Sequence, residues 1–141
     1  MSTVRQLSVL IENDADRISG VTQILAESGI NLRGFSVSDT PDFAVLRLIV
    51  DDPDRALGVL SDAGFVVKQS DVVCILVPDE PGGLAGVLKI VSDAGVNIEY
   101  VYSIVATNVV FNVPDAGKAL ARLADRPVRL VSQEEIADWP A

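Results

Sequence analysis

The chain contains an internal repeat, which constrains its fold more than any other feature of the sequence. When the sequence is shifted by 66 residues, the first half of one copy aligns with the first half of a second copy without a gap. The aligned identical residues include Leu10 with Leu76, Gly20 with Gly86, Gly29 with Gly95, and Asn31 with Asn97. After a three-residue deletion in the second copy the offset becomes 63, so that Asp52 aligns with Asp115. We therefore expect two domains, residues 1–70 and 71–141, with almost no linker between them.

Both copies show the same order of expected elements, β-α-β-β-α-β. Strands are expected at residues 6–11, 30–38, 43–50 and 65–69 in the first copy, and at 72–77, 96–105, 107–113 and 128–132 in the second. First helices are expected at 16–28 and 82–94. Second helices begin at the capping residues Asp52 and Asp115, and end at Gly64 and before Pro127. The remaining residues, 133–141, are expected to form a loose end or a short turn.

Apolar residues at helical spacing indicate which helix faces are buried. The expected buried residues are Ile18, Val21, Leu25, Ala56, Leu57, Leu60 and Ala63 in the first copy, and Leu84, Val87, Leu88, Val91, Ala119, Leu120 and Leu123 in the second. The element order is that of the split βαβ fold. The expected fold class is α+β, with two ferredoxin-like βαββαβ units, each an antiparallel four-stranded sheet with two helices on one face.

One strand carries apolar residues on both of its faces. The segment 72–77 reads Val-Val-Cys-Ile-Leu-Val, whereas a sheet that is covered on one face alternates apolar with polar residues. Tyr100 and Tyr102 share one face of the next expected strand. We therefore expect the helix-free face of the second sheet to be covered, by the other copy or by another chain.

Composition excludes several classes of function. The net charge is −9, with 11 basic and 20 acidic residues, which argues against nucleic acid and anionic membranes as partners. The chain has no histidine, and its single cysteine, Cys74, is expected in the core. We expect no metal site, no cofactor and no catalysis, because the common general base and zinc ligands are missing. No signal peptide or membrane-length apolar run is present, so a cytoplasmic location is expected.

Two loop motifs in each copy carry a family resemblance. In the second copy the first loop reads Val77-Pro-Asp-Glu-Pro-Gly-Gly-Leu-Ala85, and the helix that follows ends in Gly95-Val-Asn-Ile98. The first copy has Val9-Leu-Ile-Glu-Asn13 and Gly29-Ile-Asn-Leu32. These motifs resemble those of the ACT family, whose members are typically regulatory modules that bind amino acids. The first copy departs from the family pattern, because Ala15-Asp16-Arg17 stands where the family has Pro-Gly.

The resemblance implies a site for a small amino acid where the first loop of one unit meets the Gly-x-Asn loop of a neighbouring unit. An α-carboxylate suits the free N–H groups of a helix N-terminus, and an ammonium group suits carboxylate and amide oxygens. The expected ligand-binding residues are Asn13, Asp14, Asn31, Leu32, Asp79, Gly82, Gly83, Leu84, Asn97 and Ile98. A homodimer is also expected, because ACT-like units usually close their edges and apolar faces by association.

Structural roles for the same residues stay open. Asn31 and Asn97 can satisfy turn backbone groups, Asn13 and Asp79 can cap a helix, and Gly82 can serve the loop alone. Tyr100 and Tyr102 can pack against a neighbouring sheet. For function, the leading interpretation is a non-catalytic amino-acid sensor. The alternatives are a regulatory subunit of a separate enzyme of amino-acid metabolism, and an enzyme on a ferredoxin-like fold.

Overall fold

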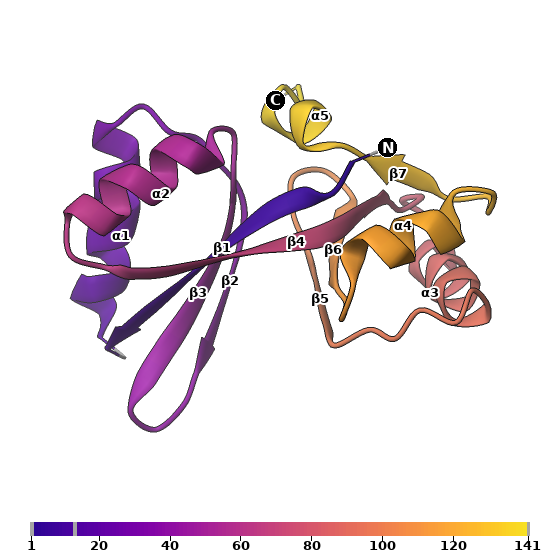
Figure 1. Cartoon of the computed structure of the whole chain (residues 1–141), viewed down its shortest axis with the longest axis horizontal. Helices are drawn as coiled ribbons and strands as arrows, with labels where there is room; N and C mark the ends of the chain where they lie inside the picture. The colour runs from indigo at the N-terminus through magenta and orange to yellow at the C-terminus, as the bar shows by residue number, and fades with distance from the viewer. Residues whose placement is uncertain (1, 13, 141) are drawn as a thin grey trace. The chain divides into compact units, whose positions relative to one another are not determined.

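A computed structural model describes residues 2–12 and 14–140 (Figure 1). The expected ligand residue Asn13 therefore lies outside the described residues. Packing of the backbone divides the chain into two compact units. One contains residues 5–70, and the other contains residues 71–140 together with residues 2–4. Each unit is described by itself below, and the division into domains of residues 1–70 and 71–141 remains a prediction.

The first unit has the predicted order of elements. Its elements are β1 (Val4–Glu12), α1 (Ala15–Glu27), β2 (Leu32–Asp39), β3 (Phe43–Val50), α2 (Pro53–Asp62) and the first part of β4 (Val66–Leu76). The strands lie in the order β4-β1-β3-β2. Strand β3 pairs antiparallel with both β1 and β2, so β2 is an edge strand. Both helices lie on the same side of this sheet (Figure 1).

The second unit repeats this arrangement and adds a short helix. The rest of β4 is followed by α3 (Gly83–Asp93), β5 (Tyr100–Ser103), β6 (Asn108–Asn112), α4 (Ala116–Leu123), β7 (Arg129–Val131) and α5 (Gln133–Ala137). The strand order is β7-β4-β6-β5, with antiparallel pairing throughout. Both units thus have the strand order of a ferredoxin-like fold, and the predicted fold class is confirmed.

Capping side chains explain where most of the helices begin. Asp14 accepts a hydrogen bond from the Asp16 backbone N–H at 2.8 Å, and thereby caps α1. As expected, Asp52 and Asp115 cap α2 and α4, accepting hydrogen bonds from Arg55 N–H at 3.2 Å and Lys118 N–H at 3.0 Å. Each such bond satisfies one of the N–H groups that the first helical turn leaves unpaired, and is worth about 1 kcal/mol.

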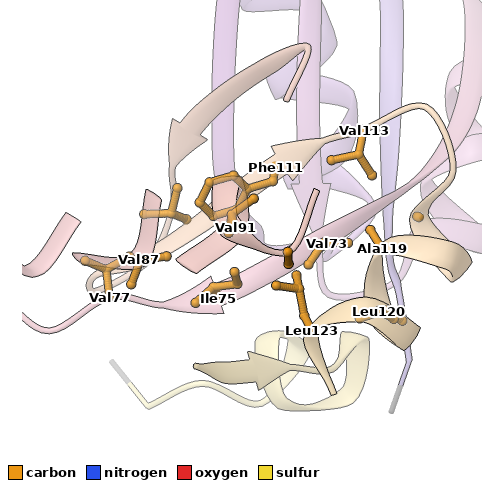
Figure 2. Close-up of a cluster of buried hydrophobic side chains, with 13 residues drawn as sticks. Val73, Ile75, Val77, Val87, Val91, Phe111, Val113, Ala119, Leu120 and Leu123 are labelled. Carbon is orange, nitrogen blue, oxygen red and sulfur yellow. The ribbon is translucent and has the colours of Figure 1, made fainter. Parts of the chain in front are cut away.

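Each unit has its own apolar core between its helices and its sheet. In the second unit the alternate residues Val73, Ile75 and Val77 lie in one apolar cluster with side chains of α3 and α4 (Figure 2). The core of the first unit is formed in the same way, by Leu7, Val9, Ile11, Val21, Leu25, Ile30, Ala44, Leu46, Leu48, Val50, Ala56 and Leu60. Burial of one such side chain stabilises the fold by about 1.5–3 kcal/mol. The alternation therefore fixes which face of each strand meets the helices.

The opposite face of the second part of β4 is also buried. Val72 and Cys74 are 0% and 1% exposed, although their neighbours in sequence face the helices. Ile136 of α5 is fully buried, and the charge of Glu135 acts on the Cys74 thiol. Burial, and to a smaller extent that charge, raise the pKa of Cys74 to about 12. Cys74 is thus a core residue, as predicted. Covering of this face by another copy remains a prediction.

The prediction of a loose end or a short turn at the C-terminus was wrong for residues 133–137, which form α5. A reciprocal capping box begins this helix, in which the Ser132 hydroxyl accepts from Glu135 N–H and the Glu135 carboxylate accepts from Ser132 N–H, each at 3.1 Å. The backbone hydrogen bond from Ser132 is the largest of the effects that lower the pKa of Glu135. The sequence signal was present, because Ser-x-x-Glu before an apolar residue is a helix-start motif.

Two residues of the expected buried stripes lie on the surface. Leu84 is 46% exposed, because the row of α3 that faces the core is Gly83, Val87 and Val91, one position away from it. Ala63 is exposed because α2 ends before it, at Asp62.

The second strand of the second unit is also shorter than predicted. Val96 and Ile98 pack against the core from a loop before β5 begins.

Replacing Ile136 with alanine tests the role of α5 in the second unit. Because this side chain is fully buried, its truncation should reduce the free energy of unfolding by about 2–5 kcal/mol in urea titrations. Leu84→Ala removes a similar side chain from the surface and should cost less than about 0.5 kcal/mol. Equal losses for the two variants would contradict this assignment of α5.

Candidate functional site

The first loop of the second unit lies beside a cavity of about 610 Å³. This loop, residues 78–82, joins the end of β4 to α3. The cavity brings together three of the predicted ligand residues, Asp79, Gly82 and Gly83. The full lining is Leu76, Val77, Pro78, Asp79, Glu80, Gly82, Gly83, Gly86, Val87, Ile90, Thr107, Pro127, Val128 and Arg129. The cavity is therefore surrounded by one face of α3, by the end of β4, and by residues at or just before the starts of β6 and β7.

Two adjacent glycines set the shape of this loop. Gly82 has φ +82°, a left-handed conformation that residues with a side chain rarely adopt. A Cβ atom on Gly83 would lie 2.0 Å from the Pro78 carbonyl oxygen, so the loop closes against the helix only with glycine at this position. Glycine was expected here to let a ligand approach the backbone. The geometry adds a second reason, which is packing within the loop itself.

The N-terminus of α3 has no side-chain cap. Its N-cap residue is Gly82, whereas side chains cap the other four helices in the part of the chain that the structure describes. The loop is held instead by backbone bonds, from Glu80 N–H to the Pro78 oxygen and from Gly83 N–H to the Glu80 oxygen, both at 3.0 Å. A helix N-terminus without a cap favours an anion, because its N–H groups and dipole are positive.

Charged side chains of both signs line the same cavity. Asp79 and Glu80 supply carboxylates, and Arg129 of β7 supplies a guanidinium group. The Arg129 side chain also bonds the Glu135 carboxylate at 3.3 Å, and lies 5.7 Å from the ring centre of Trp139. These contacts hold the guanidinium group of Arg129 in place. The cavity thus offers both acceptors for a cation and donors for an anion.

Asn97, from the Gly-x-Asn loop, lines a different cavity of about 250 Å³ in the same unit. That cavity lies beside the start of α4, and its polar lining includes Asp115, Lys118 and Arg122. Arg122 donates a hydrogen bond from Nη1 to the Gly95 carbonyl oxygen at 2.7 Å, which ties the loop to α4. Within this one unit, then, Asn97 and Asp79 do not line a common cavity.

The corresponding loop of the first unit is closed by a different contact. The Asn31 backbone N–H donates to the Asp51 carboxylate at 3.0 Å, and Asp51 N–H donates back to the Asn31 carbonyl oxygen at 3.1 Å. At the position of Asp51 the second copy has Pro114, which lacks both the carboxylate and the N–H group. The backbone of Asn31 thus has a structural role in this turn.

The other predicted ligand residues have separate locations. Asp14 caps α1, and Leu84 is exposed on α3 without lining the large cavity. Leu32 and Ile98 are half-buried and pack against the cores of their units. Their assignment to a ligand site remains a prediction.

Sequence reasoning missed three polar residues of the large cavity, Glu80, Thr107 and Arg129. Glu80 adjoins the predicted Asp79, so the loop motif itself indicated it. Arg129 begins β7 and Thr107 immediately precedes β6, and only the antiparallel register brings them to the end of β4. Arg129 pairs with Leu76, and the Thr107 carbonyl oxygen accepts a hydrogen bond from Val77 N–H at 3.0 Å.

No three His, Cys, Asp or Glu side chains within residues 2–12 and 14–140 are grouped so that they could hold a metal ion. The buried Cys74 thiol stays protonated at neutral pH, because its pKa is raised to about 12. Over the same residues, no helix combines the length and apolar character that crossing a bilayer requires.

Comparison with known proteins identifies the family. The family model described as an ACT domain pair matches residues 2–138. The chain belongs to this ACT family. No match was found among curated proteins. The ACT pair is similar to a crystal structure of a protein from Bacteroides thetaiotaomicron, with a TM-score of 0.90 and 38% sequence identity over 97% of each chain.

Two aspartate kinase regulatory subunits share the fold of this ACT pair. The subunit from Thermus thermophilus, solved free of ligand, superposes with a TM-score of 0.62 at 22% identity, over 87% of this chain and 92% of that one. The subunit from Thermus flavus superposes with a TM-score of 0.57 at 20% identity, over 88% and 92%. The predicted family resemblance is thus confirmed for nearly the whole chain.

Gly83→Ala tests the packing of the ACT pair's first loop in the second unit. Because the added Cβ would meet the Pro78 oxygen at 2.0 Å, the loop must shift, and the free energy of unfolding should fall by about 1–3 kcal/mol. The matched control is Gly86→Ala on the same helix, where the added atom has no neighbour within 4 Å. That change should be neutral or stabilise by up to about 1 kcal/mol. Two variants of equal stability would refute the tight contact.

Proposed function

We propose that this ACT pair is a non-catalytic regulator that binds a free amino acid, and that the cavity beside Asp79 is one of its binding sites. The uncapped N-terminus of α3 beside two carboxylates carries the proposal. A free amino acid is a zwitterion, and this cavity presents groups of both signs within one unit. Membership of the ACT family supports the same ligand class.

In the proposed complex the α-carboxylate lies at the N-terminus of α3, near Arg129. The ammonium group then lies near the carboxylates of Asp79 and Glu80. Hydrogen bonds between ionised groups are roughly twice as strong as those between neutral groups. A ligand that engages both ends would therefore be favoured over one that carries only an amine or only an acid.

A regulatory role follows if the amino acid changes how the pair associates with a separate enzyme. The Thermus proteins that share its fold are named regulatory subunits of aspartate kinase. We propose an analogous arrangement here, in which the partner is a separate enzyme of amino-acid metabolism.

We also propose a cytoplasmic location. The unpaired Cys74 thiol and the acidic net charge of −9 fit this location.

A thermal-shift screen of the twenty amino acids, with follow-up on one variant, tests amino-acid binding. A ligand present at about 100 times its dissociation constant adds about 2.7 kcal/mol to native-state stability, which should raise the melting temperature by several degrees. Asp79→Asn should reduce this rise, because the amide lacks the charge that the ammonium group requires.

The matched control is Asp125→Asn, the same change at an exposed position that lines none of the cavities described here. It should leave the shift unchanged. If none of the twenty amino acids raises the melting temperature, or if both variants retain the full shift, the Asp79 cavity is not an amino-acid site.

We further propose that the protein forms a homodimer through the edge strand β2. Phe35 is 63% exposed and Val37 is 44% exposed on this strand, which has a partner on only one side. Exposed edges with apolar side chains favour association. Sedimentation equilibrium at micromolar concentration should show a species of twice 15.0 kDa, and Phe35→Lys should convert it to the monomer. The same change at Val101, also exposed, is the control, and a wild-type monomer would refute this proposal.

A further inference from the structure

The first unit contains a second cavity, of about 260 Å³, at the same place in the repeat as the Asp79 cavity. Its lining is Leu10, Ile11, Glu12, Arg17, Phe43, Gly64, Phe65 and Val66. The offsets of the repeat place Leu10 on Leu76, and Val66 on Arg129. Each cavity thus lies between the end of its unit's first strand and the start of its unit's last strand.

Three large apolar side chains of this cavity are exposed to solvent. Leu10, Phe43 and Val66 are 45%, 43% and 59% exposed. Phe43 pairs with Glu12 in the sheet, and Glu12 lies two residues from Leu10. Leu10, Glu12 and Phe43 therefore point to the same face of β1 and β3, away from the helices. Val66 shares this face, because its neighbour Val67 packs into the core. Together they form an apolar surface at one end of the sheet.

The second unit lacks this apolar surface. Arg129 replaces Val66, and its guanidinium group is engaged by Glu135 and Trp139 at the C-terminus. At the offset of 63 residues, the small residue Ala106 stands at the place of Phe43. The two cavities therefore differ in what they offer a ligand side chain, although they occupy the same position in the fold.

Two opposite charges complete the lining of the first cavity. Glu12 lies at the end of β1, and Arg17 lies in the first turn of α1, at the repeat position that Gly83 occupies in the second copy. No hydrogen bond or ion pair engages either side chain within the described part of the unit. A guanidinium group binds a carboxylate through two parallel hydrogen bonds, and a carboxylate binds an ammonium group.

We propose that the first-unit cavity binds a free amino acid with a large apolar side chain. Arg17 binds its carboxylate, Glu12 binds its ammonium group, and its side chain packs on Leu10, Phe43 and Val66. The cavity is slightly smaller than the roughly 300–1,000 Å³ of sites for drug-sized ligands, which suits a single amino acid. This inference rests on the proposed amino-acid binding, and it assigns a different side-chain preference to each copy.

Titration calorimetry on the full chain tests the proposal, with L-leucine and L-phenylalanine as apolar probes and L-serine and L-aspartate as polar ones. The apolar probes should bind through the first unit. Arg17→Gln, and Val66→Arg, which introduces the residue of the second copy, should each weaken that binding at least tenfold. Arg55→Gln and Val101→Arg are matched changes outside the cavity and should alter the affinity less than twofold. Circular dichroism of each variant checks that it is folded.

The same titrations separate this inference from the proposed function. If only polar probes bind, and their binding depends on Asp79, the apolar specificity of the first unit is wrong while amino-acid binding stands. Leucine binding that survives both Arg17→Gln and Val66→Arg would overturn the assignment of the cavity. If no amino acid binds at all, both proposals fail.

Discussion

The strand β4 is the element on which both units depend. It runs without a break from Val66 to Leu76, so its first part closes the sheet of the first unit and its second part begins the sheet of the second. The exposure of its side chains differs between these two parts. Val66, Lys68 and Gln69 are exposed, whereas Val72 to Ile75 are buried at every position. A strand that is buried on both faces cannot shift its register without moving apolar side chains away from their partners. The loop at its end, and with it the Asp79 cavity, is thereby held in place.

Much of the fold followed from the repeat and from local signals. The repeat gave the order of the elements twice, and the aspartates at positions 52 and 115 marked the starts of two helices that the structure confirms. Local sequence patterns gave wrong predictions where tertiary packing decides which side chains are buried. Leu84 fits a helical stripe, but the close contact between Gly83 and Pro78 sets which side of α3 meets the sheet. Residues 133–137 form α5 because a capping box begins the helix at Ser132 and because Ile136 is buried, and that burial depends on tertiary packing.

The candidate site was predictable only in part. The Pro-Gly-Gly loop could be recognised from its residues, because glycine serves positions that a side chain would block. Arg129 and Thr107 lie far from that loop in the sequence, and only the pairing of β7 with β4 and the position of β6 bring them to it. Asn97 was expected beside the first loop of a neighbouring unit. Within its own unit it lines the smaller cavity near Asp115 instead, and its place beside the first loop of a neighbouring unit stays a prediction.

The two copies keep one backbone arrangement and differ in the chemistry at the same end of the sheet. One carries an uncapped helix N-terminus with two carboxylates, and the other carries Glu12 and Arg17 beside an apolar surface. Binding at the Asp79 cavity is most directly tested by backbone amide NMR of the ¹⁵N-labelled full chain. The ligand is chosen from the amino acids whose stabilisation of the protein depends on Asp79, as the one that stabilises it most. When the protein is saturated with this ligand, the amide resonances of Gly82, Gly83 and Leu84 should shift more than those of Gly20 and Gly58, which line neither cavity. Shifts that leave residues 79–84 unchanged for every amino acid would contradict the assignment of this cavity as a ligand site.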